Sequence, residues 1–197
     1  PKGSRLKLQF HYTSIGIEQT DEPLLGLYFY KKNEKPEKHF DIQGIPNRAF
    51  SIPANTKNFP VEQTVTLEQS VETIGFAPHM HYRGNSMAFK VKLPDENKYK
   101  TVLSVPQYSF NWQYMYWLNK PLTMPKGTKV KVSATYDNSS TNPLNPDPSN
   151  SVRWGQLSTD EMFIGFMMYS PKEPERPIID VFNYLSDETP NLKEAVL

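Results

Sequence analysis

Two histidines two positions apart, His79 and His81, are the residues of this chain best suited to metal chemistry. They lie in the run Phe76-Ala77-Pro78-His79-Met80-His81-Tyr82-Arg83-Gly84. In an extended strand, side chains at positions i and i+2 leave the same face, so both imidazoles can reach one ion. The spacing alone does not select the metal, because imidazole binds zinc as well as copper. Such a pair also arises by chance on the polar face of a strand.

A thioether later in the chain would make such a site softer. Met162 ends the run Ser158-Thr159-Asp160-Glu161-Met162, directly before the apolar stretch 163–169. Both alternating faces of that stretch are apolar, which predicts a strand buried on both sides. Core packing is the simplest interpretation of Met162. As a ligand, its sulfur would complete a site of two nitrogens and one sulfur, which favours copper over zinc or magnesium.

The composition predicts an all-β protein and excludes several kinds of chemistry. The 197 residues include 11 Tyr, 11 Phe, 3 Trp, 9 Gly and 18 Pro, and no long helical pattern is present. There is no cysteine, which excludes disulfides, thiolate metal sites and cysteine nucleophiles. The 22 basic and 21 acidic residues nearly cancel, so we expect no nucleic-acid partner. We also expect no membrane span, because no apolar run is long enough.

The strands that must position these residues follow one another at regular intervals. A clean alternation of apolar and polar residues predicts the first strand over 5–13. Further strands are expected over 24–30, 61–67, 71–76, 86–93, 100–105, 112–117, 128–136 and 161–169. Proline, glycine and carboxylate residues predict turns at 94–97 and 125–127. We therefore predict an all-β, antiparallel, jelly-roll-like β-sandwich.

The stretch 137–150 consists almost entirely of turn-forming residues. Its three prolines prevent a regular ladder of backbone hydrogen bonds. Its carboxylates and amides suggest a calcium site, but their spacing does not match an EF-hand loop. A rigid surface loop that positions the segment 154–162 is the simpler interpretation.

With these motifs, the sequence resembles the second catalytic domain of the copper type II, ascorbate-dependent monooxygenases. This family includes peptidylglycine α-hydroxylating monooxygenase and dopamine β-monooxygenase. His79-Met80-His81 followed by Gly84 resembles the family's His-x-His pair, and Asp160-Glu161-Met162 resembles its Asp-Glu-Met motif. The resemblance implies that His79, His81 and Met162 bind the copper that activates oxygen. It also implies hydroxylation of a carbon-hydrogen bond of a small-molecule substrate, with ascorbate or another electron donor, in the periplasm or outside the cell.

The residues around the motifs look closer to a bacterial branch of this family than to the animal enzymes. They are Tyr82-Arg83-Gly84, Tyr108-Ser109-Phe110-Asn111-Trp112-Gln113, Tyr136-Asp137-Asn138-Ser139, Asn142-Pro143-Leu144-Asn145-Pro146 and Trp154-Gly155. The disulfides of the animal domains are absent.

The positions that hold substrate in the peptide-amidating enzyme also differ here. Ala77 stands where that enzyme has an Arg, and Ile164 and Phe166 stand where it has Asn and Tyr. We therefore do not expect a C-terminal glycine peptide as substrate. Candidates for an apolar wall beside the copper, each of which also suits a core position, are Phe163, Phe166, Met168, Tyr108, Trp112 and Trp117.

The start of the chain resembles the end of the family's first domain, whose last strand supplies a histidine to a second, electron-transferring copper. His11 matches that position, although by itself it is typical of a half-exposed polar face. The adjacent histidine pair that the second copper also needs is absent from these 197 residues. The resemblance thus implies one complete copper site and one incomplete site.

The chain begins with Pro1 rather than Met, so we expect it to be part of a longer chain. We expect residues 1–14 to be the last strand of a preceding, mostly absent β-domain. Residues 15–170 would form the copper-binding sandwich, and residues 171–197 a C-terminal extension. An N-terminal domain or an electron-transfer partner would then complete the enzyme.

Two functions of different classes remain open. The first is an oxygen-activating copper monooxygenase domain. The second is a β-sandwich that binds copper or assembles with other proteins but performs no catalysis. The incomplete second site favours the non-catalytic module. The complete three-ligand set favours the enzyme, because an assembly module has no physical need for all three ligands.

Overall fold

The computed structural model describes residues 3, 5–8, 10, 12, 15–34, 38, 40–172, 178 and 179. The chain divides into two units, Pro1–Pro36 and Glu37–Leu197, and each is described by itself. In the described residues, no helix is long and apolar enough to cross a membrane.

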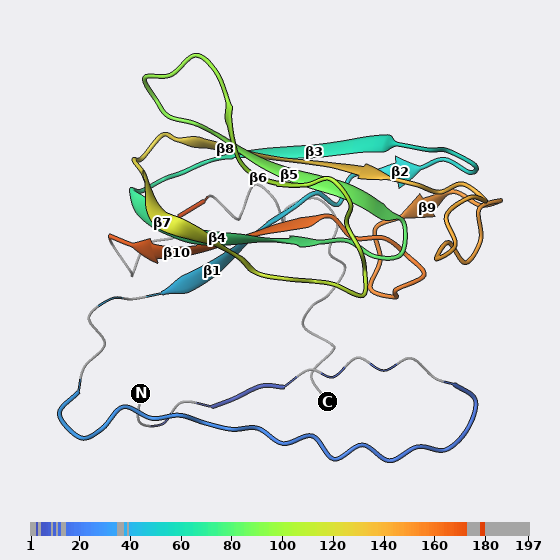
Figure 1. Cartoon of the computed structure of the whole chain (residues 1–197), viewed down its shortest axis with the longest axis horizontal. Coiled ribbons are helices and arrows are strands. Elements are labelled where there is room, and N and C mark those ends of the chain that lie inside the picture. Colours follow the sequence, from blue (N-terminus) through green and yellow to red (C-terminus); the bar gives the residue numbers. More distant parts are fainter. Residues whose placement is uncertain are drawn as a thin grey trace. The chain divides into compact units, whose positions relative to one another are not determined.

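The second unit is an antiparallel β-sandwich of two four-stranded sheets (Figure 1). The first sheet has the order β1 (Asp41–Pro46), β10 (Ile164–Pro171), β4 (Val71–His79) and β7 (Tyr116–Met124). The second has the order β3 (Phe59–Thr66), β8 (Lys129–Tyr136), β5 (Gly84–Lys92) and β6 (Lys100–Val105). A short pair joins β2 (Ser51–Ile52) to β9 (Val152–Arg153). The predicted all-β, antiparallel sandwich is confirmed, and jelly-roll-like connectivity stays a prediction.

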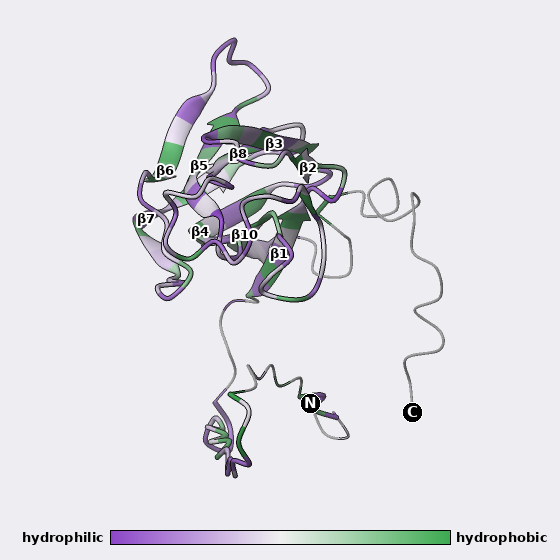
Figure 2. Ribbon diagram, turned by 90° about the vertical axis from the view of Figure 1, so that its right-hand side faces the viewer, coloured by the Kyte–Doolittle hydropathy of each residue, from purple (hydrophilic) through white to green (hydrophobic). Residues whose placement is uncertain are grey.

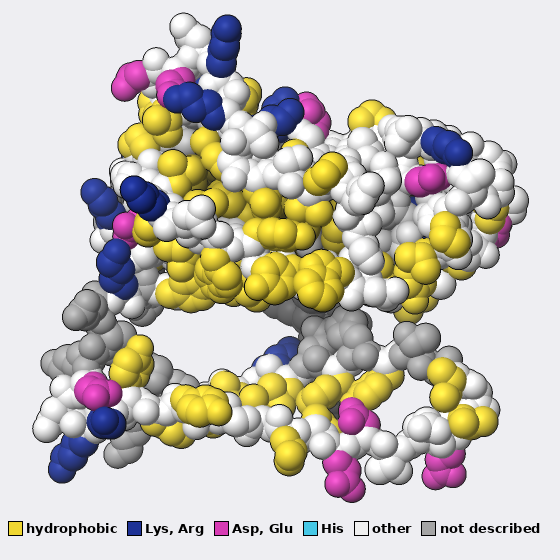
Figure 3. Space-filling model, in the orientation of Figure 1, with side chains coloured by type: hydrophobic (Ala, Val, Ile, Leu, Met, Phe, Trp, Pro, Cys, Tyr) yellow, Lys and Arg dark blue, Asp and Glu magenta, His cyan; other side chains and the backbone are white. Residues whose placement is uncertain are grey.

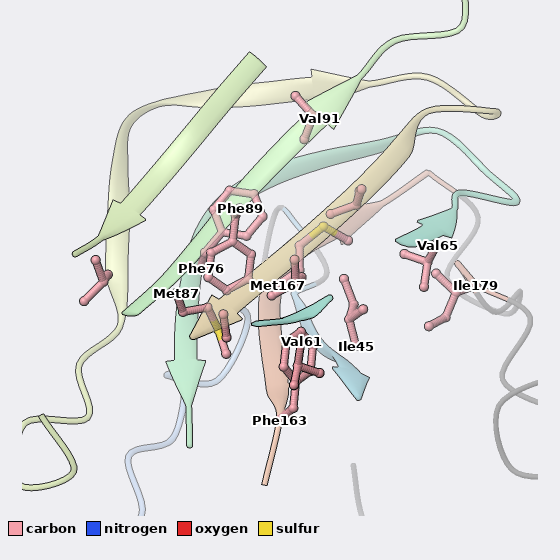
Figure 4. Packing of buried hydrophobic residues seen from close by; sticks show 14 of the residues in the cluster. Ile45, Val61, Val65, Phe76, Met87, Phe89, Val91, Phe163, Met167 and Ile179 are labelled. Atoms are coloured by element: carbon pink, nitrogen blue, oxygen red, sulfur yellow. The ribbon is translucent and has the colours of Figure 1, made fainter. Parts of the chain in front are cut away.

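The core lies between the two sheets and is built by alternation along the strands. In β8, Val130, Val132 and Ala134 are buried while the residues between them are more exposed. Phe76 of β4 and Phe89 of β5 meet across the sandwich with ring centroids 4.9 Å apart (Figure 4). Hydrophilic residues dominate the hairpin between β5 and β6, whereas the strands carry hydrophobic residues (Figure 2). Burial of each large side chain contributes roughly 1.5–3 kcal/mol, which stabilises the fold without disulfides.

Most of the expected strands of this unit form within three residues of their predicted limits. The prediction over 112–117 is wrong in position, because β7 begins at Tyr116 and continues to Met124. Strand β1 was not predicted, since Gly44 and Pro46 interrupt its apolar pattern. Strand β4 extends past Pro78 to His79, because its pairing with β10 continues there.

The strands expected over 5–13 and 24–30 are wrong for the described residues of these ranges, which have no strand structure. A strand needs a neighbour to accept and donate its backbone hydrogen bonds, and alternation of side chains does not supply one. Leu24 and Tyr28 are fully exposed, at 99% and 101%. Within this unit, the hydroxyl of Tyr12 donates to Asp21 Oδ2 at 2.7 Å.

Gly165 provides a test of how tightly the two sheets pack. A Cβ atom at this position would lie 2.7 Å from Val132 Cγ2 and 2.8 Å from Phe89 Cε1. We expect Gly165→Ala to lower the free energy of unfolding by about 1–3 kcal/mol through overpacking. Gly44→Ala on the adjacent strand is the control, because its nearest contact would be an ordinary 3.4 Å. Urea unfolding measures both, and equal stabilities would contradict the packing described.

Candidate metal centre

The pairing of β4 with β10 brings the two predicted ligand motifs together. Ile164 pairs with His79, and Gly165 pairs with Pro78. Continuing this antiparallel register beyond the strands sets Met162 opposite His81. Residues opposite each other in an antiparallel pair project from the same face. Within the strands, the register puts His79 and Ile164 on one face of the first sheet, and the same register carried two residues further would put His81 and Met162 on that face.

This is the outer face of the sheet, away from the core. Phe76 and Met80, which alternate with the histidines, belong to the core cluster, as does Met167 of β10. Met162 is only 8% exposed, yet it lies outside that cluster. His81 is buried at 5% exposure, and His79 is half-buried. The three predicted ligands thus lie on the surface of the sandwich and are partly shielded from solvent.

The ring of His79 is oriented by Gln113. Its Nδ1 lies 2.6 Å from Gln113 Oε1, and Gln113 Nε2 donates to the carbonyl oxygen of Phe110 at 3.0 Å. The second bond fixes the orientation of the amide, so its oxygen faces the imidazole. Nδ1 of His79 must then carry the proton and donate it. A metal would be bound through Nε2.

The ring of His81 is oriented by a backbone carbonyl. Its Nδ1 lies 3.3 Å from the oxygen of Asp160, which only accepts, so Nδ1 again carries the proton. Burial lowers the pKa of His81 and favours the neutral ring that a metal requires. The two imidazole centroids are 5.4 Å apart and their planes are perpendicular. Both rings therefore present the same nitrogen, Nε2, as the metal-binding atom.

The buried carboxylate of Glu161 joins the two ligand segments. Its Oε2 accepts from the amides of His81 at 2.9 Å and Met162 at 3.2 Å. Its Oε1 accepts from the amide of Arg83 at 2.7 Å. Burial raises the pKa of Glu161 to about 7, and these amides and the Arg83 charge partly offset that effect. One side chain thus holds the backbone of His81 and Met162, two of the three predicted ligands.

Two buried tyrosines hold the same segments from the core side. The hydroxyl of Tyr108 donates to the carbonyl oxygen of Met80 at 2.6 Å and accepts from its amide at 3.1 Å. The hydroxyl of Tyr136 donates to the carbonyl oxygen of Met162 at 2.8 Å. Burial raises the pKa of Tyr108 to about 12, and that of Tyr136 well above its usual value. Both hydroxyls therefore stay protonated and remain donors.

The loop 137–150 is tied to this centre through Arg83, which is 2% exposed. Its Nε donates to Asn138 Oδ1 and its Nη1 to the carbonyl oxygen of Thr159, both at 2.8 Å. Asn138 Nδ2 in turn donates to the carbonyl oxygens of Pro53 and Asn150. These bonds support the structural interpretation of the loop.

The donor set of the centre suits copper. Among the described residues, no three His, Cys, Asp or Glu side chains come together to hold a metal. A metal at His79 and His81 would therefore take another kind of third ligand, and the register offers the thioether of Met162. Two imidazoles and a thioether make a soft site, which suits copper rather than magnesium or calcium.

The remaining predicted residues have mixed outcomes. His11, the expected ligand of a second copper, lies outside the described residues. Of the six apolar-wall candidates, Phe166, Met168 and Trp117 lie on the outer face with the ligands. Phe163 and Tyr108 belong to the core cluster, the alternative that sequence analysis gave for every wall candidate. Trp112 is exposed and stacks on Tyr114.

Sequence analysis named Gln113, Tyr136 and Glu161 only as parts of motifs and assigned none of them a role in holding the predicted ligands. Gln113 lies 34 positions from His79, and Glu161 lies 80 positions from His81. Only the strand register could have related residues so far apart in the chain.

The chain matches the model of a known protein family. The family described as "Copper type II ascorbate-dependent monooxygenase, C-terminal domain" matches residues 41–180, which include both ligand motifs. The chain belongs to this family. It is therefore a copper monooxygenase domain in the general sense, and the family implies dependence on copper and ascorbate.

Gln113 offers a test of ring orientation. We expect Gln113→Ala to weaken copper binding about 10- to 100-fold, because partners that orient a ligating imidazole typically contribute that much. Isothermal titration with a competing chelator measures the affinity. Gln63→Ala on the other sheet is the matched control and should leave it unchanged. Unaltered affinity in Gln113→Ala would show that this bond does not orient His79.

The tyrosines offer a test of the backbone supports. Tyr108→Phe leaves the amide and carbonyl of Met80 without their partner, so we expect it to destabilise the fold by about 1–3 kcal/mol. Copper affinity should fall as well, since Met80 lies between the two histidines. Tyr169→Phe is the control, because that hydroxyl makes only a 3.3 Å bond to Asp41. Chemical unfolding and copper titration of both variants provide the comparison.

Proposed function

We propose that this chain is the domain of a copper-dependent monooxygenase that hydroxylates a carbon-hydrogen bond with molecular oxygen at His79, His81 and Met162. The observation that carries the proposal is the pairing of Ile164 with His79, in a chain that belongs to the copper monooxygenase family. This register aligns the two ligand motifs, which are about 80 residues apart in the chain.

When bound, copper would supply the activation of molecular oxygen. The protein's own contribution is to hold the donor atoms before the metal arrives. Gln113 and the carbonyl of Asp160 occupy Nδ1 of the two imidazoles and turn Nε2 toward the site. The thioether of Met162 is a soft ligand and favours the reduced, monovalent state of copper.

The context of the domain is part of the proposal. We propose that residues 1–14 end a preceding β-domain, that 15–170 form the copper-binding domain and that 171–197 are a C-terminal extension. His11 would contribute to a second copper in that preceding domain. Ascorbate or a partner protein would donate electrons, and a small molecule would be the substrate. A bacterial branch of the family, with action in the periplasm or outside the cell, fits the residues around the motifs.

A non-catalytic copper-binding or assembly module is the second candidate. One observation favours it: besides the pair at 79 and 81, the chain contains only His11 and His39. The adjacent histidine pair expected for the electron-transferring copper is thus absent from these 197 residues.

The ligand assignment predicts the copper content and spectrum of single variants. We expect one copper per chain at this site, with a copper-sulfur signal in X-ray absorption of the reduced protein. Met162→Leu should remove that signal, and His79→Ala should remove the copper. Met115→Leu is the matched control, because Met115 is an exposed methionine that follows Gln113 closely in the chain. A signal that survives in Met162→Leu would contradict the assignment.

Ascorbate-dependent oxygen consumption then separates the two functions. The protein in its natural chain context should consume oxygen with ascorbate, and His79→Ala should not. Stoichiometric copper without oxygen consumption would support the non-catalytic module instead.

A further inference from the structure

The outer face of the second sheet carries four lysines in two directly opposed pairs, called the lysine block below. Lys90 of β5 lies opposite Lys131 of β8, and Lys92 lies opposite Lys129 in the same register. The residues that alternate with them belong to the core, so all four lysines point away from it. Like charges directly opposite each other in a sheet are destabilising, so two such pairs in succession are costly to the fold.

The described residues around the lysine block neutralise it only in part. Lys131 Nζ lies 3.1 Å from Glu62 Oε1 and 5.4 Å from the ring centroid of Tyr99. Within the part of the chain that the structure describes, Lys90 and Lys129 make no ion pair. Figure 3 shows Lys and Arg side chains over this layer of the sandwich, near the hairpin that joins β5 to β6. The chain as a whole has a formal net charge of only +1, so this face concentrates positive charge.

A groove of about 690 Å³ lies on the same face, next to the lysine block. It is lined by Ala88, which pairs with Ser133 on one side and with Ser104 of β6 on the other. Ala88 and Ser133 are two residues from Lys90 and Lys131 on their strands. Short side chains thus adjoin long ones, which accounts for the groove. Its volume falls within the roughly 300–1,000 Å³ typical of small-molecule sites.

The polar groups of the groove are hydroxyls and amides that the protein holds in place. Asn85 Nδ2 donates to Asn58 Oδ1 at 3.2 Å and to Thr135 Oγ1 at 3.1 Å. The hydroxyl oxygens of Ser86 and Thr135 lie 2.6 Å apart. A hydroxyl donates one hydrogen bond and accepts two, so these side chains retain capacity for a ligand. Groups of this kind match the hydroxyls of a sugar.

The chemistry of this face favours an acidic saccharide over other anionic partners. Proteins that bind single-stranded nucleic acid stack its bases on aromatic side chains, and no aromatic side chain of the described residues lines the groove. Binding to a membrane surface needs apolar side chains that enter the lipid, whereas the side chains beside the lysines are mainly Ser, Thr and Ala. The ion pair of Lys131 with Glu62 shows that this face accommodates a carboxylate.

The length of the face requires more than one sugar unit. Lys129 lies at one end of β8 and Thr135 lies six residues further along it. At roughly 3.3 Å per residue this is about 20 Å, so only a chain of sugars contacts both the lysine block and the far end of the groove.

We propose that the lysine block and the groove bind an acidic oligosaccharide, with sugar carboxylates on Lys90 and Lys129 and sugar hydroxyls in the groove. The site lies on the outer face of the second sheet, whereas His79 lies on the outer face of the first sheet. The inference therefore goes beyond the proposed function and does not depend on copper. Such binding would attach the domain to an acidic polysaccharide and leave the metal centre open.

Isothermal titration of the full chain with trigalacturonate tests the proposal. Trigalacturonate should bind, with an affinity that falls as salt is added, because salt screens exposed charges. Its methyl ester, which has the same sugar chain without the charge, should bind at least tenfold more weakly. Triglutamate, which has carboxylates but no hydroxyls, should also bind at least tenfold more weakly. No binding of trigalacturonate, or equal affinity for either comparison compound, would overturn the proposal.

Single charges of the lysine block can be removed without loss of the fold. Lys90→Gln and Lys129→Gln should each weaken trigalacturonate binding at least threefold, and the double variant at least tenfold. Each removes one charge from a like-charge pair, so the urea midpoint should not fall. Lys120→Gln is the matched control, because Lys120 is an exposed lysine on β7 of the first sheet. Unchanged affinity in the double variant, or an equal loss in Lys120→Gln, would overturn the proposal.

Filling the groove tests its role separately from the charge. Ala88→Phe should weaken trigalacturonate binding at least tenfold, and Asn119→Phe on β7, which adds the same ring to an exposed position of the first sheet, should not change it. Unchanged affinity in Ala88→Phe would overturn the role of the groove. Metal-free and copper-loaded protein should bind trigalacturonate equally, so binding without copper would support this proposal even if the proposed function fails.

Discussion

The pairing of β4 with β10 is the constraint on which the rest of the centre depends. A slip of one residue would turn His79 of β4 into the core and expose Phe76. The core opposes such a slip, because Gly165 of β10 lies so close to Val132 and Phe89 that even a methyl group would collide with them. Packing between the sheets therefore selects the register, and the register aligns the proposed ligands.

Buried polar side chains carry this alignment beyond the ends of the strands. Beyond the paired strands, the carboxylate of Glu161 accepts three hydrogen bonds from backbone amides. The hydroxyls of Tyr108 and Tyr136 donate to the backbone carbonyls of Met80 and Met162. Burying a carboxylate is costly unless its oxygens are satisfied, and here each oxygen has at least one amide donor. Because all these partners come from the protein, the segments that carry the ligands are held whether or not a metal is bound.

The limits of sequence analysis follow from the same geometry. The direction of side chains alternates from one residue to the next along a strand and needs no information about distant residues. The two-residue spacing of His79 and His81 was therefore sufficient to predict a shared face. Gln113 could not be found this way, because its relation to His79 depends on how β7 pairs with β4. Strand β1 was missed because it owes its structure to its partner β10 rather than to its own pattern. Residues 24–30 show the reverse case, in which a strand-like pattern without a partner forms no strand.

Alternation also separates the residues that maintain the core from those on the outer face of the sheet. On β4 and β10, the inward-facing residues Phe76 and Met167 belong to the core, so their volume is constrained by the opposite sheet. The outward-facing residues Ala77, Ile164 and Phe166 lie outside the core cluster. They are the three positions at which the chain differs from the residues that hold substrate in the peptide-amidating enzyme. The register of the sheet can therefore stay the same while the residues on its outer face change from charged and polar to apolar.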